Sequence, residues 1–444
     1  MTSSRGSART ITATEAAALV TSGMWIDYGV TLCQPDVFDR ALAARRDELR
    51  DVKFRSCIAV KPRAVIDVDP KGEHFFWFSW HFSGYERKKH DLGLSHYIPL
   101  NLGELPDYYR RFIEPVDIVV LKTCPIDENG FFNFSATNAW HRAIVERAKC
   151  VIVEVSPGLP YVFGEGNGVH VSEVDYIIEG DPDPATELPN APPSEVDRAV
   201  GRLIAGEIEN GSSLQIGIGG MPNAVCTSLL DSDVRDLGVH SEMLTDGMIA
   251  LYKAGIINGR AKNLNRGKTI FTFALGSPEL YSTIHRNPDM QCYPVDYTNL
   301  PHNIMQNDKV VAINNTTQID LQGQAASESD GFRHISGTGG QLQFVRGAYA
   351  SPGGKSFMCL SSTYEKGGVR KSRIALGLTH GNIVTTPRSD MMYVVTEYGI
   401  VNLKAKSVAE RARALISIAH PDFREDLERQ AYHHRLIPRG FTFA

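Results

Sequence analysis

The chain has 444 residues, of which 42% are hydrophobic and 22% are charged, and its formal net charge is −5. This composition is close to the average for globular proteins and leaves room for two or three domains. The weak negative charge argues against nucleic acid and anionic membranes as partners, and no apolar run approaches the length that crosses a membrane.

The cysteines and the first residues point to a reducing compartment. Seven cysteines are scattered along the chain without a CxxC pair or the spacing of a metal site. This pattern predicts free thiols, and no bound metal, rather than a disulfide framework. The N-terminal residues also lack the apolar core of a secretory signal. We therefore expect a cytoplasmic protein.

One pattern opens both halves of the chain. It consists of a helix, the motif Gly-x-x-apolar-x-x-Gly-apolar and a proline, and it occurs at residues 15–35 and again at 195–222. A second motif, Ile-Asp-x-x-Gly, stands at 126–130 and at 319–323. The two pairs follow in the same order at offsets of 188 and 193 residues, which predicts a duplicated domain.

Short apolar runs alternate with amphipathic helices in both halves. The runs that predict strands are 118–121, 150–155, 213–218, 309–313, 356–360 and 392–396. Helices are predicted over 195–208 and 408–418, and capping boxes that begin at Ser194 and Ser407 open them. The alternation is typical of α/β domains with largely parallel sheets.

A proline-rich segment separates the halves. Five prolines fall between Gly180 and Ser194, a density that neither a helix nor a central strand tolerates. We therefore predict an N-terminal domain at 1–180, a linker at 181–194 and a C-terminal domain at 195–444.

Two glycine-rich segments of the second half could contact a ligand. Residues 217–222, Gly-Ile-Gly-Gly-Met-Pro, follow a predicted strand and open a helix, so their backbone N–H groups could face an anion. A simple tight turn, or a nucleotide-binding loop of imperfect spacing, would also explain them. Residues 336–348 hold three glycines within four positions, which permit close approach to a ligand or a positive φ angle, or only connect two strands. In this segment Arg346 could pair with a phosphate or with a carboxylate.

Two side chains are candidate nucleophiles by residue type. Glu242 stands between small or polar neighbours after a short apolar stretch, although a glutamate is more often a solvated surface residue. Cys33 has no base partner evident in the sequence, which favours a buried core cysteine over a nucleophile.

Together these motifs resemble the acetyl-CoA hydrolase and transferase family, and within it the butyryl-CoA:acetate and 4-hydroxybutyrate CoA-transferases. The resemblance covers nearly the whole chain. It rests on residues 79–87, 116–118, 217–225, 240–243, 294–297, 304–308, 318–324 and 339–341. It implies a CoA-transferase-like fold: two similar tandem α/β domains with the active site between them.

The resemblance also implies roles for individual residues. It makes Glu242 the nucleophile. The residues it implies in CoA binding are Gly217, Ile218, Gly219, Gly220, Met221, Thr317, Gly340 and Lys366. Arg370 or Lys371 could take the place of Lys366. The family often has Leu at position 317 and Asp at position 343, where this chain has Thr and Gln.

The implied reaction moves CoA between two carboxylates through a glutamyl-CoA thioester, with CoA as substrate and covalent intermediate and no permanently bound cofactor. Its tetrahedral intermediates need oxyanion donors, for which we expect the backbone N–H groups of Ile218 and Gly340. The expected partners are acyl-CoA, small carboxylates and further copies of this chain in a dimer or tetramer. His81 and Tyr85 could reach the acyl pocket, although a packed aromatic cluster at 75–82 is the favoured interpretation.

Three other functions remain open at this point. A hydrolase of the same fold would resolve the same glutamyl-CoA with water. A nucleotide-binding oxidoreductase would rest on residues 217–220 alone, and a binding protein without catalysis would leave Glu242 idle.

Overall fold

The computed structural model describes residues 8–189, 192–217 and 219–438. The chain forms two compact units, Met1–Pro189 with Ile270–Asn299, and Asn190–Thr269 with Leu300–Ala444. The boundary after Pro189 thus falls inside the predicted linker, and the first unit also includes a later segment of thirty residues. The predicted domain limits stay a prediction. Within the described ranges, none of the helices has the length and apolar character needed to cross a membrane.

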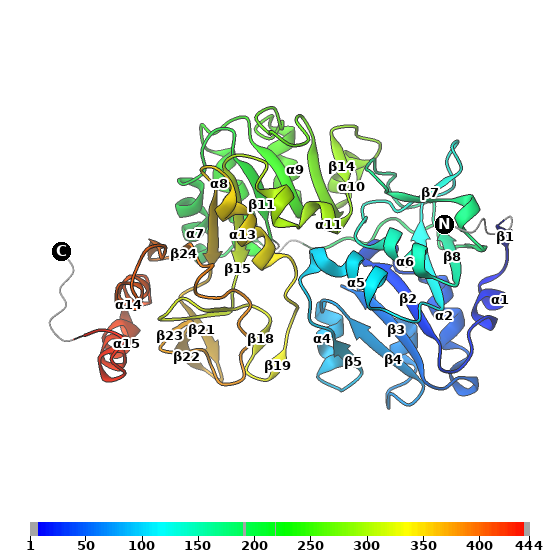
Figure 1. Ribbon diagram of the computed structural model, residues 1–444, viewed down its shortest axis with the longest axis horizontal. Coiled ribbons are helices and arrows are strands. Elements are labelled where there is room, and N and C mark those ends of the chain that lie inside the picture. The colour runs from blue at the N-terminus through cyan, green and yellow to red at the C-terminus, as the bar shows by residue number, and fades with distance from the viewer. Residues whose placement is uncertain (1–7, 190–191, 218, 439–444) are drawn as a thin grey trace. The chain divides into compact units, whose positions relative to one another are not determined.

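The first unit is built on an eight-stranded sheet in the order β1-β10-β8-β6-β2-β3-β4-β5, with parallel neighbours throughout (Figure 1). Its strands are β1 (Arg9–Thr10), β2 (Trp25–Val30), β3 (Val52–Cys57), β4 (Phe75–Ser79), β5 (Ser95–Tyr97), β6 (Ile118–Thr123), β8 (Cys150–Val155) and β10 (Tyr176–Glu179). Its helices are α1 (Ala13–Ala18), α2 (Val37–Ala43), α3 (Ala64–Asp67), α4 (Gly84–His90), α5 (Leu105–Arg111) and α6 (His141–Arg147). A small ribbon pairs β7 (Phe131–Asn133) with β9 (Gly168–His170).

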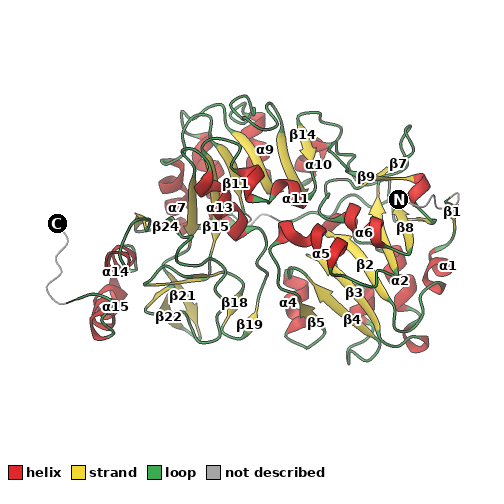
Figure 2. Ribbon diagram, viewed as in Figure 1, coloured by secondary structure: helices red, strands yellow, loops and turns green. Residues whose placement is uncertain are grey.

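Helices cover both faces of this sheet (Figure 2). On one face α1 and α2 bury Ala16 and Phe38 against Val120 of β6. On the other face α5 and α6 bury Leu105 and Ile144 in one cluster with further residues of the same strand. Because successive side chains of a strand point to opposite faces, the apolar runs of β6 and β8 supply both clusters, as parallel strands buried on two sides require.

The second eight-stranded sheet has the order β14-β13-β12-β11-β15-β20-β24-β25. Its strands are β11 (Ser213–Ile216), β12 (Gly238–Leu244), β13 (Thr269–Ala274), β14 (Met290–Cys292), β15 (Val310–Asn315), β20 (Lys355–Cys359), β24 (Tyr393–Thr396) and β25 (Gly399–Asn402). The helices from residue 195 on are α7 (Glu195–Ala205), α8 (Gly220–Leu230), α9 (Asp246–Lys253), α10 (Pro278–Ile284), α11 (Val295–Thr298), α12 (Pro301–Ile304), α13 (Gln341–Ala350), α14 (Val408–Ser417) and α15 (Pro421–His433). The short strands β16 (Gln318–Asp320), β17 (Ala325–Ala326) and β23 (Ile374–Ala375) form a small sheet, and two hairpins pair β18 (Ser329–Asp330) with β19 (Arg333–His334) and β21 (Thr363–Lys366) with β22 (Val369–Ser372).

The α/β class with largely parallel sheets is therefore confirmed. The predicted strand at 150–155 coincides with β8, and those near 310, 356 and 393 differ from β15, β20 and β24 by one or two residues at an end. The capping boxes that begin at Ser194 and Ser407 are present at the starts of α7 and α14.

The two sheets share one strand order. In the first, β2 has β3, β4 and β5 in sequence on one side and β6, β8 and β10 on the other. In the second, β11 has β12, β13 and β14 on one side and β15, β20 and β24 on the other. This correspondence is what a duplicated domain predicts.

The repeated Ile-Asp-x-x-Gly motif forms the same turn twice. Asp127 accepts at Oδ1 the backbone N–H groups of the residues two and four positions on, both at 2.9 Å. Asp320 accepts the equivalent pair at 3.0 and 2.9 Å. The glycines Gly130 and Gly323 follow with φ angles of +82° and +94°, a region that favours glycine. A shared turn of this detail supports duplication independently of the sheets.

Candidate active site

The candidate residues of the second unit gather where parallel strands end. Ser213 of β11 lies opposite Gly238 of β12. Gly217 follows directly after β11, and Glu242 lies toward the carboxyl end of β12. Ligands of open α/β sheets bind outside the carboxyl ends of the strands, where the strand order reverses. Because β11 lies at that reversal, this edge is the place to expect a ligand.

Glu242 is only partly buried, on a strand that is otherwise inside. The residues of β12 on both sides of it, from Gly238 to Ser241 and from Met243 to Leu244, are buried. The Ser241 hydroxyl donates to the Met243 carbonyl at 2.7 Å, so the neighbouring polar side chain is held by the strand itself. This position differs from that of a solvated surface glutamate, because a sheet edge presents the carboxylate on a rigid support.

The glycine turn after β11 needs its glycines. Gly219 has a φ angle of +123° and caps α8, a conformation that residues with a Cβ rarely adopt. A Cβ on Gly220 would lie 2.5 Å from Oδ2 of Asp197, so the Asp197 side chain would have to shift to admit one. The turn leads into an 11-residue helix, whose first N–H groups lack intrahelical partners. Ile218 lies outside the described residues, so its predicted N–H donor role stays a prediction.

The second glycine segment also opens a helix. Gly340 caps α13 with φ −94°, which any residue can adopt, whereas its neighbour Gly339 has φ +57°. The backbone conformation thus favours glycine at position 339 rather than at position 340. Arg346, further along α13, pairs through Nε with Oδ1 of Asp390 at 2.8 Å, which realises the carboxylate alternative for that residue.

Thr317 is held by its own loop. Its hydroxyl donates to the Ala326 carbonyl at 2.7 Å, and its carbonyl accepts from Nη1 of Arg373 at 2.8 Å. Arg373 is a half-buried cation that sequence reasoning missed. Burial lowers the pKa of its guanidinium, which lies 4.9 Å from the ring centroid of Tyr364. The alternation of residues 370–373 in a strand could have placed it on the face shared with Lys371.

The β21–β22 hairpin separates the three basic candidates. Tyr364 lies opposite Lys371, and Lys366 opposite Val369, so both lysines share one face of the ribbon. Lys366 pairs with Asp330 at 3.1 Å and its side chain is 60% exposed. Arg370 belongs to the other face and pairs with Asp422 at 3.4 Å. The geometry therefore groups Lys366 with Lys371 and sets Arg370 apart.

A buried lysine supports the strand that carries Glu242. Nζ of Lys262 donates to the carbonyls of Val239 and Lys268, each at 2.8 Å. Only 3% of the residue is exposed, and burial lowers the pKa of its amine from 10.5 to about 7. The amine thus donates hydrogen bonds inside the unit, and its burial makes it lose its proton at a lower pH than an exposed lysine.

This lowered pKa predicts a pH-dependent stability. Between pH 7 and 10.5 the unfolded chain carries a proton on Lys262 that the folded chain lacks, so the free energy of unfolding rises with pH in that window. Over two pH units the gain is up to about 2.7 kcal/mol. In Lys262→Met the difference in unfolding free energy between pH 7.5 and 9.5, measured by urea titration, should shrink by roughly that amount. The surface substitution Lys253→Met is the control, and equal pH slopes in Lys262→Met and the unmodified chain would contradict the expectation.

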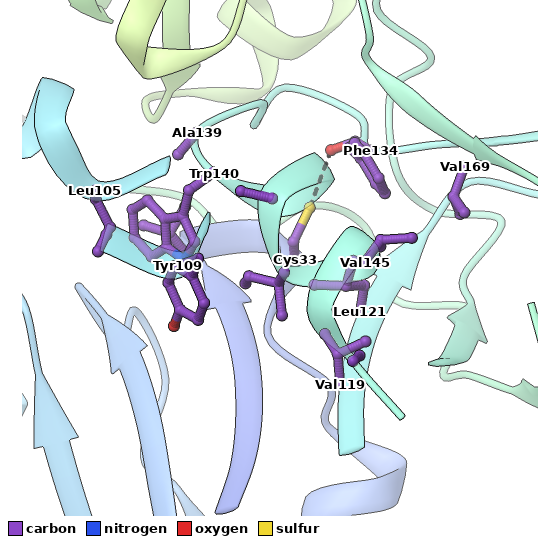
Figure 3. Packing of buried hydrophobic residues seen from close by; sticks show 14 of the residues in the cluster. Cys33, Leu105, Tyr109, Val119, Leu121, Phe134, Ala139, Trp140, Val145 and Val169 are labelled. Carbon is purple, nitrogen blue, oxygen red and sulfur yellow. Dashed lines mark hydrogen bonds between the residues drawn. The ribbon is translucent and has the colours of Figure 1, made fainter. Parts of the chain in front are cut away.

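Two candidates of the first unit prove to be packing residues. Cys33 is fully buried, and its Sγ donates to the Phe134 carbonyl at 3.0 Å within the cluster shown in Figure 3. Burial raises the pKa of its thiol far above the usual range, so the core interpretation of Cys33 is confirmed. Tyr85 donates its hydroxyl to Asp67 at 2.8 Å, beside the largely buried aromatic cluster at 75–82, which includes Trp77. The packed-cluster interpretation therefore holds for these aromatic residues.

Known proteins are similar to this chain over most of its length. Residues 6–189 match the family model of the acetyl-CoA hydrolase/transferase N-terminal domain, and residues 276–431 match that of the C-terminal domain. A butyryl-CoA:acetate CoA-transferase of Anaerostipes caccae is 46% identical over 95% of either chain. A 4-hydroxybutyrate coenzyme A transferase of Clostridium kluyveri is 38% identical over 94% of this chain and 96% of its own. The crystal structure of RipA from Yersinia pestis, 36% identical, superposes with a TM-score of 0.87 over 97% of this chain and 98% of that one.

Proposed function

This chain belongs to the acetyl-CoA hydrolase/transferase family and is a CoA-transferase, and from that we propose that it exchanges CoA between a short-chain acyl-CoA, such as butyryl-CoA, and a carboxylate such as acetate. The observation that carries the proposal is Glu242, a partly buried carboxylate at the carboxyl edge of a parallel sheet beside a glycine turn. The relatives named for butyryl-CoA and acetate support this choice of substrates.

The proposed mechanism is a ping-pong exchange. A carboxylate oxygen of Glu242 attacks the thioester carbonyl carbon, the carbon–sulfur bond breaks, and CoA leaves as a thiolate from an acyl-glutamyl anhydride. The thiolate then attacks the glutamyl carbonyl carbon, which releases the first acid and forms glutamyl-CoA. The acceptor carboxylate reverses both steps. Thioester energy is conserved throughout, so the exchange requires no further reactant.

We assign the oxyanion donors to the backbone of Ile218 and Gly340. Each tetrahedral intermediate carries a negative oxygen, and one donor lost at such a site costs about 3 kcal/mol. Two local observations support this assignment. Gly219, next to position 218, has a φ angle of +123°. Gly340 stands at the start of a helix, where N–H groups are left without intrahelical partners.

We further propose that CoA contacts residues 217–221, Thr317, Gly340 and the lysine face of the β21–β22 hairpin. The reaction would take place in the cytoplasm, in keeping with seven free cysteines, and in a dimer or tetramer of identical chains. Light scattering on the purified chain tests the oligomeric state.

Acceptor dependence tests the proposed function. With butyryl-CoA and acetate together, we expect acetyl-CoA to appear as fast as butyryl-CoA disappears, with no release of free thiol. With butyryl-CoA alone, consumption should stop after about one equivalent per chain, once glutamyl-CoA has formed. Continuous release of free CoA without an acceptor would instead establish the hydrolase.

The β21–β22 hairpin predicts that CoA contacts its lysine face rather than Arg370. Lys371→Ala is expected to raise the KM for butyryl-CoA about threefold to tenfold, because it removes a cation from the proposed phosphate-binding face. The same substitution should have little effect on a pantetheine thioester, which lacks the phosphates. Arg370→Ala is the matched control, since Arg370 lies on the opposite face with Asp422 as its partner. Equal effects of the two substitutions on KM would refute this assignment.

A further inference from the structure

The two glycines at 339–340 are attached to the rest of the second unit on both sides. Oγ1 of Thr338, the residue before them, donates to Oε2 of Glu328 at 2.8 Å. Nε2 of Gln341, the residue after them, donates to Oγ1 of Thr386 at 2.9 Å. The start of α13 is therefore fastened by one side-chain hydrogen bond before the glycines and by another after them.

Glu328 and Thr386 belong to two chain segments that are hydrogen-bonded to each other. The backbones of Ala325 and Thr386 exchange two N–H to carbonyl bonds of 3.1 Å each, as in an antiparallel strand pair. Oγ1 of Thr385 accepts the Ser327 N–H at 3.0 Å and donates to Oε1 of Glu328 at 3.3 Å. Both fastenings of the glycines thus lead to one hydrogen-bonded support.

Glu328 is a buried acidic residue of this support. Only 4% of it is exposed. Burial of a carboxylate is costly unless its oxygens accept hydrogen bonds, and hydrogen bonds to a carboxylate are stronger than those between neutral groups. The Glu328 backbone carbonyl also accepts the Ile335 N–H at 2.8 Å, so the chain between Glu328 and Thr338 folds back on Glu328. This arrangement favours a role in fixing the loop over an incidental contact.

The same support holds Thr317, which is among the residues proposed to contact CoA. The Ala326 carbonyl accepts both the backbone N–H of Thr317 at 3.0 Å and its hydroxyl at 2.7 Å. Ala326 stands two positions before Glu328. The segment that carries Glu328 therefore contacts two of the loops assigned to CoA.

A backbone oxyanion donor must point in a fixed direction before the reaction begins, because a donor that reorients during the reaction stabilises the oxyanion less. The direction of the Gly340 N–H is set by the peptide plane that joins Gly339 to Gly340. Glycine restricts this plane least of all residues, and Gly339 has a φ angle of +57°. The side chains on either side must therefore supply the restraint that the glycines lack.

We propose that Glu328 is a positioning residue of the transfer reaction: through the Thr338 hydroxyl it holds the peptide at 339–340 so that the Gly340 N–H faces the oxyanion. This role rests on the proposed function, since the oxyanion arises when Glu242 attacks the thioester. Glu328 acts through Thr338 and takes no part in making or breaking bonds. Because charge on the carbonyl oxygen develops only during the attack, the restraint stabilises the transition state more than the bound substrate.

Thr338→Val removes the hydroxyl at nearly constant volume and tests the proposal by steady-state kinetics with butyryl-CoA and acetate. The turnover number is expected to fall about tenfold to a hundredfold, and the KM for butyryl-CoA should change less than about twofold. Thr338→Ser keeps the hydroxyl and should restore most of the turnover. Thr283→Val is the matched control and should keep full turnover, since the exposed Thr283 hydroxyl donates only within α10, to the Glu279 carbonyl at 2.7 Å.

Glu328→Gln tests the other end of the same bond. Because Glu328→Gln and Thr338→Val disturb one contact, their combined loss of turnover should be smaller than the product of the single losses. Urea titration checks that each variant is folded. Thr385→Val, which removes the other hydroxyl on Glu328, takes the place of a variant that is not folded and should also lower turnover without a change in KM.

Full turnover in Thr338→Val, or equal losses in Thr338→Val and Thr338→Ser, would overturn the role of Glu328. A loss confined to KM would overturn it as well. Glu242→Ala separates this role from the proposed function. If Glu242→Ala transferred CoA normally, the proposed function itself would fail. If Glu242→Ala were inactive while Thr338→Val turned over normally, only the role of Glu328 would fail.

Discussion

Glu242→Ala is expected to lower the turnover number for CoA transfer by at least about a thousandfold, because the variant lacks the carboxylate that forms the covalent intermediate. Glu242→Asp keeps the charge but withdraws the nucleophile by one methylene, so it should retain a small part of the activity. The assay follows acetyl-CoA formation from butyryl-CoA and acetate.

The matched control is Glu209→Ala. Glu209 pairs with Lys309 at 2.9 Å, just before β15, at the amino ends of the same parallel strands, so its loss should leave turnover nearly unchanged. Borohydride added after butyryl-CoA alone should reduce the thioester at Glu242 and inactivate the enzyme. A modified peptide elsewhere in the chain would contradict the assignment of the nucleophile.

Glu154→Ala is expected to lower the free energy of unfolding by about 3–5 kcal/mol, measured by guanidinium titration. The Glu154 side chain is fully buried, and its carboxylate accepts the N–H groups of Asp36, Val37 and Phe38 at 2.8–3.0 Å. Alanine would leave these three donors buried without an acceptor and remove a negative charge near Lys122.

The isosteric substitution Glu154→Gln should cost less, because its amide oxygen still accepts from part of the helix start. Glu146→Ala, which removes a half-exposed partner of Arg110, is the surface control and should cost under about 1 kcal/mol. A Glu154→Ala variant as stable as Glu146→Ala would show that the helix start is satisfied in another way.

Much of the fold could be predicted because the patterns that carry it are local. The run at 150–155, apolar except for Glu154, becomes β8 without a change of limits, since strands buried on both faces are mostly apolar. The boxes at Ser194 and Ser407 place two helix starts, since capping joins residues three positions apart. The Ile-Asp-x-x-Gly turns form within five residues for the same reason.

The remainder depends on contacts between distant parts of the chain. The Gln34 side chain donates to Ser56 and to the Cys57 carbonyl, more than twenty positions away, and the Asp36 carboxylate pairs with Arg63 from the segment after β3 and with Lys122 of β6. Arg373 gains its place through the Thr317 carbonyl, 56 residues before it. Composition and spacing contain no trace of such contacts. The sequence pointed to Glu242 through the family resemblance rather than through a local pattern.

The return of the chain to the first unit has a consequence for dissecting this protein. Ile270–Asn299 contributes Val295 to a core cluster of the first unit, and Asn138 donates its backbone N–H to the Thr272 carbonyl at 2.8 Å. Cleavage by a protease within residues 181–189 would place these partners on a separate fragment, but the contacts between them do not depend on the cut peptide bond. The fragments should therefore stay associated after cleavage. The repeated halves are thus not interchangeable cassettes, and recombination between relatives at the proline-rich segment should yield unstable chimeras.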